Sequence, residues 1–248
     1  MIGRVILAAL LAGIAAGIVM GVIQQARLTP LILEAETYEQ ASAAMHMHDA
    51  ATVPAAGATA AAPTEASGHD HDHGDEGWKP QDGLQRTLFT TFASAMAGAG
   101  FAAILAAVSL LSGLPITRRN GLIWGLCGFL AVTLAPAAGL SPELPGMPAA
   151  ELLGRQVWWV GTIAATAAGI YLIATQSRPW ALVLAVALIL APHVVGAPVA
   201  PHEESMVPPE LVARFVATSI AANAVFWCCI GLFLALVLDR TAREIYAT

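Results

Sequence analysis

The apolar stretch Val5–Ile23, VILAALLAGIAAGIVMGVI, contains no charged side chain. A helix rises 1.5 Å per residue, so about 20 residues cross the roughly 30 Å hydrocarbon core of a bilayer. A surface helix of a soluble protein carries a polar face at helical spacing, and this stretch carries none. It therefore predicts a transmembrane helix.

Further apolar runs follow along the chain, at Leu88–Leu111, Leu122–Leu140, Val157–Ala174, Trp180–Val195 and Leu211–Leu238. Apolar residues make up 57% of the 248 positions and charged residues 11%, whereas soluble domains carry about 25% charged residues. The pattern predicts an all-α membrane protein with about six transmembrane helices. The shortest run, Trp180–Val195, also fits a re-entrant or interfacial segment.

The breaks between the runs set the expected boundaries. Transmembrane helices are expected at residues 1–25, 86–112, 120–140, 151–175, 179–197 and 210–238. Between the first two lies an extracytoplasmic loop, 26–85, rich in histidine and acidic residues and largely disordered at 50–77. It is expected to open with a short helix at the membrane face that carries Glu34, Glu36, Tyr38 and Glu39. Residues 239–248 form a cytoplasmic tail. The first run is longer than the 7–15 apolar residues typical of a signal peptide, so we expect it to be retained.

Charge is distributed unevenly between the two sides of such a six-span protein. The side with both termini carries +4 and the other side carries −10, which sum to the formal charge of −6. Arginines are dense in the short connections on the terminal side. Because short cytoplasmic loops are enriched in Lys and Arg, this side is expected in the cytoplasm and the histidine-rich loop outside it.

Two short patterns recur along the sequence. Leu134-Ala135-Pro136 returns as Leu190-Ala191-Pro192, and Glu151-x-x-x-Arg155 returns as Glu210-x-x-x-Arg214. A fainter copy comes earlier. The recurrence predicts three pseudo-repeated helical hairpins, in which a proline ends each outgoing helix and an acid-x-x-x-Arg pair opens each returning one. The alternative is generic punctuation of membrane helices. The predicted structural rim comprises Pro30, Asp82, Arg86, Pro136, Glu151, Arg155, Pro192, Glu210 and Arg214.

The long loop carries two clusters with metal-ligand chemistry. One contains His46 and His48, and the other is His69-Asp70-His71-Asp72-His73. Imidazole and carboxylate groups bind divalent ions such as Co²⁺, Ni²⁺ and Zn²⁺. The clusters therefore favour metal capture over a merely solvated polar run. A flexible loop of this kind does not select cobalt, so selection is expected nearer the membrane, with Glu34, Glu36, His193 and His202 as candidate ligands.

The sequence shows no phosphate-binding loop and no set of residues that would support catalysis. We therefore expect no enzyme activity, no intrinsic cofactor and no nucleic-acid partner. The partners predicted from the residues are the lipid bilayer and a divalent metal ion.

Several strings resemble the CbtA family of probable cobalt transporter subunits. They include Pro30-Leu-Ile-Leu-Glu-Ala-Glu-Thr-Tyr-Glu39, Pro142-Glu-Leu-Pro-Gly-Met-Pro-Ala-Ala-Glu151 with Arg155-Gln-Val-Trp-Trp159, Ala191-Pro-His-Val-Val-Gly-Ala-Pro198 and Pro209-Glu-Leu-Val-Ala-Arg-Phe215. The resemblance implies a bacterial inner-membrane protein of cobalt uptake for cobalamin biosynthesis. It also implies a small single-span, histidine-rich partner of the CbtB type. Members are usually described with about five spans, one fewer than predicted here.

The functional hypothesis is thus a membrane subunit of a divalent-metal uptake transporter, with Co²⁺ as the transported ion and Ni²⁺ or Zn²⁺ as alternatives. The competing hypothesis is a non-transporting membrane accessory or sensor that binds metal and hands it to a partner.

Overall fold

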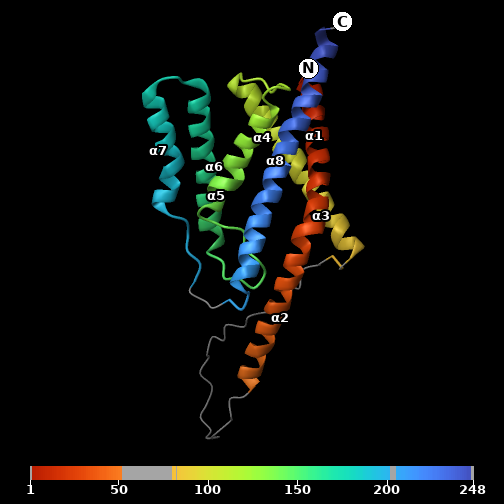
Figure 1. Ribbon diagram of the computed structural model, residues 1–248, viewed down its shortest axis with the longest axis vertical. Helices are drawn as coiled ribbons and strands as arrows, with labels where there is room; N and C mark the ends of the chain where they lie inside the picture. Colours follow the sequence, from red (N-terminus) through yellow and green to blue (C-terminus); the bar gives the residue numbers. More distant parts are fainter. Residues whose placement is uncertain (1, 52–79, 82, 202–204, 247–248) are drawn as a thin grey trace, which may run out of the picture.

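The computed structural model describes residues 2–51, 80–81, 83–201 and 205–246, and only the backbone for 2, 43–51 and 239–246. Its regular elements are all helical: α1 (Ile2–Ile23), η1 (Gln24–Leu28), α2 (Thr29–Ala51), α3 (Leu84–Ser112), α4 (Gly121–Phe129), η2 (Leu130–Leu134), α5 (Ala135–Ala137), α6 (Leu152–Thr175), α7 (Pro179–Val195) and α8 (Pro209–Tyr246). The two η elements are single π-helical segments. Each joins its neighbours without a break, so the described residues form six continuous helices (Figure 1).

Four of these helices contain a segment long and apolar enough to cross a membrane, namely Gly3–Ser42, Leu84–Ser112, Leu152–Thr175 and Pro209–Leu238. The other two, Gly121–Ala137 and Pro179–Val195, are shorter apolar helices. The 17 residues of α7 reach about 26 Å, slightly less than the hydrocarbon core. The predicted all-α membrane class with six helices is confirmed.

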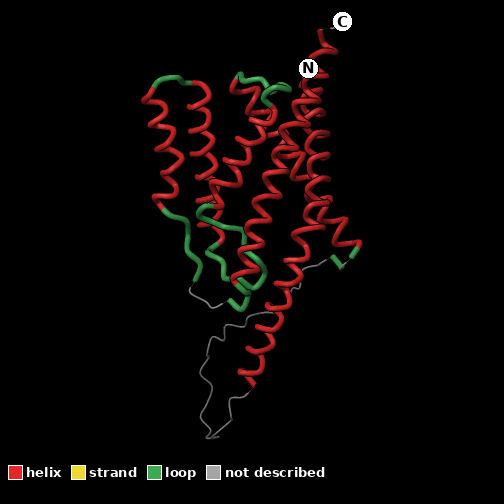
Figure 2. Tube along the Cα trace, in the orientation of Figure 1, coloured by secondary structure: helices red, strands yellow, loops and turns green. Residues whose placement is uncertain are grey.

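Both termini lie at the same end of the bundle (Figure 1). The opposite end carries α2, the segment 138–151 between α5 and α6, and residues 196–201 and 205–208 between α7 and α8 (Figure 2). We call it the distal end. The connections at the terminal end, residues 113–120 and 176–178, are short. This arrangement matches the chain topology expected for six spans.

Close backbone contact between helices builds the centre of the bundle. On α1, Gly13 and Gly17 face Gly98 and Ser94 of α3, and a methyl group added at either α1 glycine would collide with the α3 backbone. On the other side of the bundle, Gly121 of α4 lies equally close to α8. Helices in lipid associate through such small residues, because lipid tails are as apolar as the side chains themselves.

The order of packing differs from three side-by-side hairpins. α1 packs along α3 as expected for a first hairpin, but α8 packs along α1 and α4, and α7 packs along α6. In Figure 1 the α6–α7 pair stands to one side, away from α8. The third predicted hairpin is therefore corrected: α7 and α8 follow one another in the chain but do not form a packed pair.

The expected end of the first helix at Pro30 is also corrected. The helix continues through η1 into α2 as far as Ala51, so the short helix expected at the start of the 26–85 loop is longer than predicted and continuous with the first helix. Pro30 occupies the second position of α2, where the missing N–H breaks no bond of a new α-helical turn. The tail predicted at 239–248 likewise continues α8 to Tyr246. Pro136 and Pro192 do lie in the last turns of their helices.

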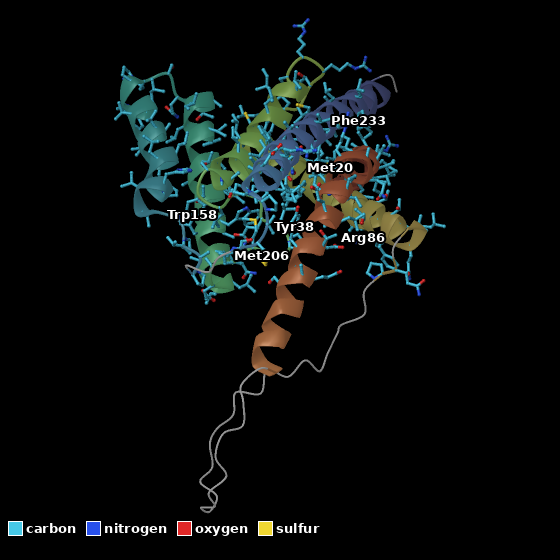
Figure 3. The ribbon with its side chains drawn as sticks, turned by 60° about the horizontal axis from the view of Figure 1, so that its bottom comes forward. Met20, Tyr38, Arg86, Trp158, Met206 and Phe233 are labelled. Atoms are coloured by element: carbon cyan, nitrogen blue, oxygen red, sulfur yellow. The ribbon has the colours of Figure 1, made fainter. Side chains whose placement is uncertain are left out.

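A compact cap covers the distal end. Leu31 and Ala35 of α2 are buried in one cluster with Leu144 and Val207 from the two distal connections. Tyr38 packs against this cluster. In Figure 3, Tyr38 and Arg86 lie on opposite sides of α2. Gly146, with φ +77°, lets the 138–151 segment turn close to α2. The cap thus ties α2 to both distal connections.

Candidate functional site

An ion pair joins the projecting helix α2 to the start of α3. Arg86 donates from Nη2 to Oε1 of Glu36 at 2.7 Å and from Nη1 to Oε2 at 3.4 Å. The two side chains are 24% and 30% exposed, so they are partly shielded from water. Paired N–H···O bonds between a guanidinium and a carboxylate fix the geometry of both groups. The pair anchors the base of α2 at the distal end.

A second ion pair occupies the corresponding place in the next part of the chain. Arg155 in the first turn of α6 donates from Nη2 to Oε2 of Glu143 at 2.8 Å, and the side chains are 30% and 26% exposed. Glu143 follows Pro136 by seven residues, and Glu36 follows Pro30 by six. In both cases an acid shortly after the proline pairs with an arginine at the start of the next helix.

This arrangement corrects the predicted acid-x-x-x-Arg pairing. Glu151 does not bind Arg155, because its carboxylate caps α6 and accepts from the N–H groups of Leu153 at 2.7 Å and Gly154 at 2.6 Å. The bond from Gly154, followed by that from Leu153, lowers the pKa of Glu151 below its usual 4.5. Unpaired N–H groups at a helix start are the nearest donors to such a carboxylate. Asp82 lies outside the described residues.

The third acid-x-x-x-Arg pattern, Glu210 to Arg214, forms no ion pair of this kind in the described part of the chain. Glu210 is in the first turn of α8 and Arg214 follows one turn later, and both side chains are exposed. The ion pairs found among the described residues do not include one between these two side chains. The predicted arginine positions are thus brought into ion pairs in the first two copies only.

The two π-helical segments sit at matching positions before prolines. Thr29, just before Pro30, donates its N–H to the carbonyl of Gln24. Ala135, just before Pro136, donates to the carbonyl of Leu130. Both bonds span five residues instead of four, so the helix gains a wider turn directly ahead of each proline. The repeated x-Pro pattern therefore marks repeated breaks in the helical hydrogen-bond pattern.

Each π segment carries a polar side chain that bonds to a neighbouring helix. Ser94 of α3 donates to Oε1 of Gln24 at 2.7 Å. Trp227 of α8 donates from Nε1 to Oγ1 of Thr133 at 3.1 Å. Sequence reasoning did not assign either contact. Polar residues a few positions ahead of the recurrent prolines were the available signal.

His193 lies at a junction of α5, α6 and α7. Its Nδ1 is 3.0 Å from the carbonyl of Ile189 and its Nε2 is 3.0 Å from the carbonyl of Ala135. The ring meets the edge of Trp158 with 5.9 Å between ring centroids, and Trp158 donates from Nε1 to the carbonyl of Pro192 at 3.1 Å. A metal ligand needs a free nitrogen lone pair. His193 could bind an ion only after its ring leaves one of these carbonyls.

The structure places the other predicted ligands as follows. Glu34 is exposed on α2, two positions before Glu36. His46 and His48 belong to the last two turns of the same helix, of which only the backbone is described. Among the described residues, no three His, Cys, Asp or Glu side chains come together as a metal site. The remaining predicted ligands lie outside the described residues: His69, Asp70, His71, Asp72, His73 and His202.

Comparison with known proteins gives a family. The family model CbtA, described as "Probable cobalt transporter subunit", matches residues 2–239, nearly the whole chain. No curated protein and no solved structure matches the chain.

Proposed function

The chain belongs to the CbtA family of probable cobalt transporter subunits, and from this premise we propose that it is the membrane subunit of a Co²⁺ uptake transporter. The observation that carries the proposal is the family match over residues 2–239 of a multi-pass helical membrane fold. A transporter subunit is not an enzyme, and we assign no catalytic residue. Cobalt enters as the transported substrate.

We propose that ion capture takes place on and beyond α2. The helix projects from the distal end (Figure 1), and its sequence includes Glu34, Glu36, His46 and His48. The segment His69–His73 adds three imidazoles and two carboxylates a short distance along the chain. Such groups bind Co²⁺, Ni²⁺ and Zn²⁺. His202, in the other distal connection, is a further ligand in this proposal.

We propose that the distal end faces the periplasm of a bacterial inner membrane and that both termini are cytoplasmic. The concentration of arginines in the short terminal-end connections supports this orientation. The family description names a subunit, which implies a partner. We propose a small single-span, histidine-rich protein of the CbtB type, and a physiological role in supplying cobalt for cobalamin biosynthesis.

The test is metal flux into proteoliposomes that contain the full chain, with and without the proposed partner. Initial uptake rates of Co²⁺, Ni²⁺ and Zn²⁺ are compared over a range of concentrations. The capture variant changes His46, His48, His69, His71 and His73 to Ala. Its matched control deletes residues 53–63, which contain no histidine and no charged residue.

We expect saturable cobalt uptake by the wild type and the control, and a raised half-saturating concentration in the capture variant. Uptake in the capture variant that follows the wild-type curve would contradict the capture role. Cobalt binding without flux, with or without the partner, would contradict the transporter and support the accessory or sensor function.

A further inference from the structure

A groove of about 390 Å³ runs beside the first half of α6 at the distal end. Its other wall is formed by η2, α5 and the start of the 138–151 segment. Most of its lining is apolar, but it contains the polar side chains of Thr133, Ser141, Glu143, Arg155 and Gln156. The lining thus combines one carboxylate, one guanidinium, one amide and two hydroxyl groups.

The ion pair Glu143–Arg155 lies in this groove. One N–H···O bond of 2.8 Å holds it, whereas the Glu36–Arg86 pair has two bonds. The Glu143 side chain is 26% exposed, so it is not closed off by the groove walls. Arg155 is the cationic side chain of the groove lining, and Glu143 is the anionic one.

The inner part of the groove reaches a break in helical hydrogen bonding. Thr133 belongs to η2, and Pro136 follows directly after the wider π turn. Because Pro136 has no N–H, it cannot satisfy a carbonyl of the preceding turn. In transporters, irregular backbone of this kind within the membrane lines ion pathways, and its carbonyl oxygens bind cations. Glu143 and Thr133 therefore contribute a carboxylate and a hydroxyl oxygen to the lining of one groove.

We propose that this groove is a divalent-cation site on the transport route, and that the incoming cation displaces Arg155 from Glu143. The inference rests on the proposed transport function and names a part of its route. Arg155 neutralises the carboxylate while the groove is empty. Once displaced, its positive charge stays near the bound cation and weakens binding, which favours onward release. The ligands are the Glu143 carboxylate and the amide and hydroxyl oxygens beside it.

The test uses substitutions that shift cobalt affinity in opposite directions. Glu143→Gln removes the anionic ligand, and we expect the half-saturating Co²⁺ concentration for uptake to rise at least roughly fivefold. Arg155→Gln removes the competing cation, and we expect the same concentration to fall by at least a similar factor. The matched control is Glu210→Gln, which makes the same charge change at an exposed site outside the groove.

A second readout reports on the groove itself. Trp159 lines it, and the difference in tryptophan fluorescence between the wild type and Trp159→Phe gives a local signal that Co²⁺ should quench. The quenching midpoint should move up in Glu143→Gln and down in Arg155→Gln. Poor folding would lower the uptake rate of either variant, but it would not lower the Co²⁺ concentration at the quenching midpoint of Arg155→Gln.

The two proposals fail in distinguishable ways. Wild-type uptake together with unchanged uptake curves and quenching midpoints in both groove variants would overturn the groove site and leave the transport function standing. No uptake by the wild type, with or without the partner, would overturn both.

Discussion

The contact between α1 and α3 gives the sharpest test of the fold. Gly98 on α3 lies against α1, and a methyl group added there would collide with the carbonyl oxygen of Gly13 and lie 3.1 Å from the backbone nitrogen of Gly17. These neighbours are backbone atoms, so no side-chain rotation can relieve the collision. Two residues along α3, Gly100 has nothing within 4 Å of the same added methyl group. Gly98→Ala and Gly100→Ala therefore add the same methyl group, which collides with α1 at residue 98 and meets open space at residue 100.

The expected magnitudes follow from this contrast. To accept the methyl group of Gly98→Ala, the two helices must separate by roughly 1 Å, which forfeits a quarter to a half of the dispersion energy of each affected atom pair. Overpacking of this kind costs about 1–3 kcal/mol. Both substitutions gain up to about 1 kcal/mol of helix propensity, because both glycines lie inside α3. This term cancels in the comparison, so we expect the two variants to differ in free energy of unfolding by the overpacking cost, about 1–3 kcal/mol.

The assay is reversible unfolding of the full chain in mixed micelles, followed by circular dichroism across a titration with sodium dodecyl sulfate. Gly98→Ala should unfold at a clearly lower denaturant fraction than the wild type, and Gly100→Ala should not. Equal unfolding midpoints for the two variants would refute the close α1–α3 contact and, with it, the placement of the Gln24–Ser94 bond about one turn along the same interface.

Other predictions use the same unfolding assay. The buried hydroxyl of Thr166 has no hydrogen-bond partner in the described part of the chain, so Thr166→Val should leave the free energy of unfolding unchanged or raise it. Thr162→Val loses a 2.8 Å bond to the carbonyl of Trp158 and should lower the free energy of unfolding by about 1 kcal/mol. An equal loss of stability in the two variants would contradict this. The lowered pKa of Glu151 means that its cap stabilises the fold above pH 4.5 and is lost as pH falls through the lowered value. The stability gap between wild type and Glu151→Gln should therefore close in acid, and a gap independent of pH would exclude this role. A double-mutant cycle of Glu36→Gln and Arg86→Gln should give a coupling of about 0.5–1 kcal/mol, because the pair is partly exposed; additive effects would show that the pair does not couple.

The number of helices and their approximate positions could be predicted because charged and polar breaks separate the apolar runs, four of which are long enough to cross a bilayer. The continuation of the first helix could not be predicted from Pro30 alone, since a proline normally ends or kinks a helix. The segment after Pro30 is rich in Ala and Glu and contains two Met, all residues of high helix propensity. That composition was the available signal for α2.

Helix pairing was the least predictable feature. An apolar side chain facing lipid and one facing another helix look alike in the sequence, so the packing of α7 on α6 and of α8 on α1 and α4 has no simple signature. The arginines of the ion pairs were identified from the sequence, but their partners were not. A carboxylate at a helix start has backbone N–H groups closer than any side chain, as Glu151 shows, so the arginine binds an acid elsewhere.

The sequence repeat acquires a different physical meaning in the structure. It does not repeat a packed helical hairpin; it repeats a disturbance of the helical hydrogen-bond pattern at a proline, accompanied by polar side-chain contacts. At Pro30 and Pro136 a π turn precedes the proline. At the second and third prolines the neighbouring carbonyls meet side chains of other helices, with the His193 ring 3.0 Å from Ala135 and the Trp158 indole donating to Pro192. In a bilayer each disrupted backbone group must find such a partner or line a polar path. The His193 ring and the Trp158 indole supply such partners at the second and third prolines.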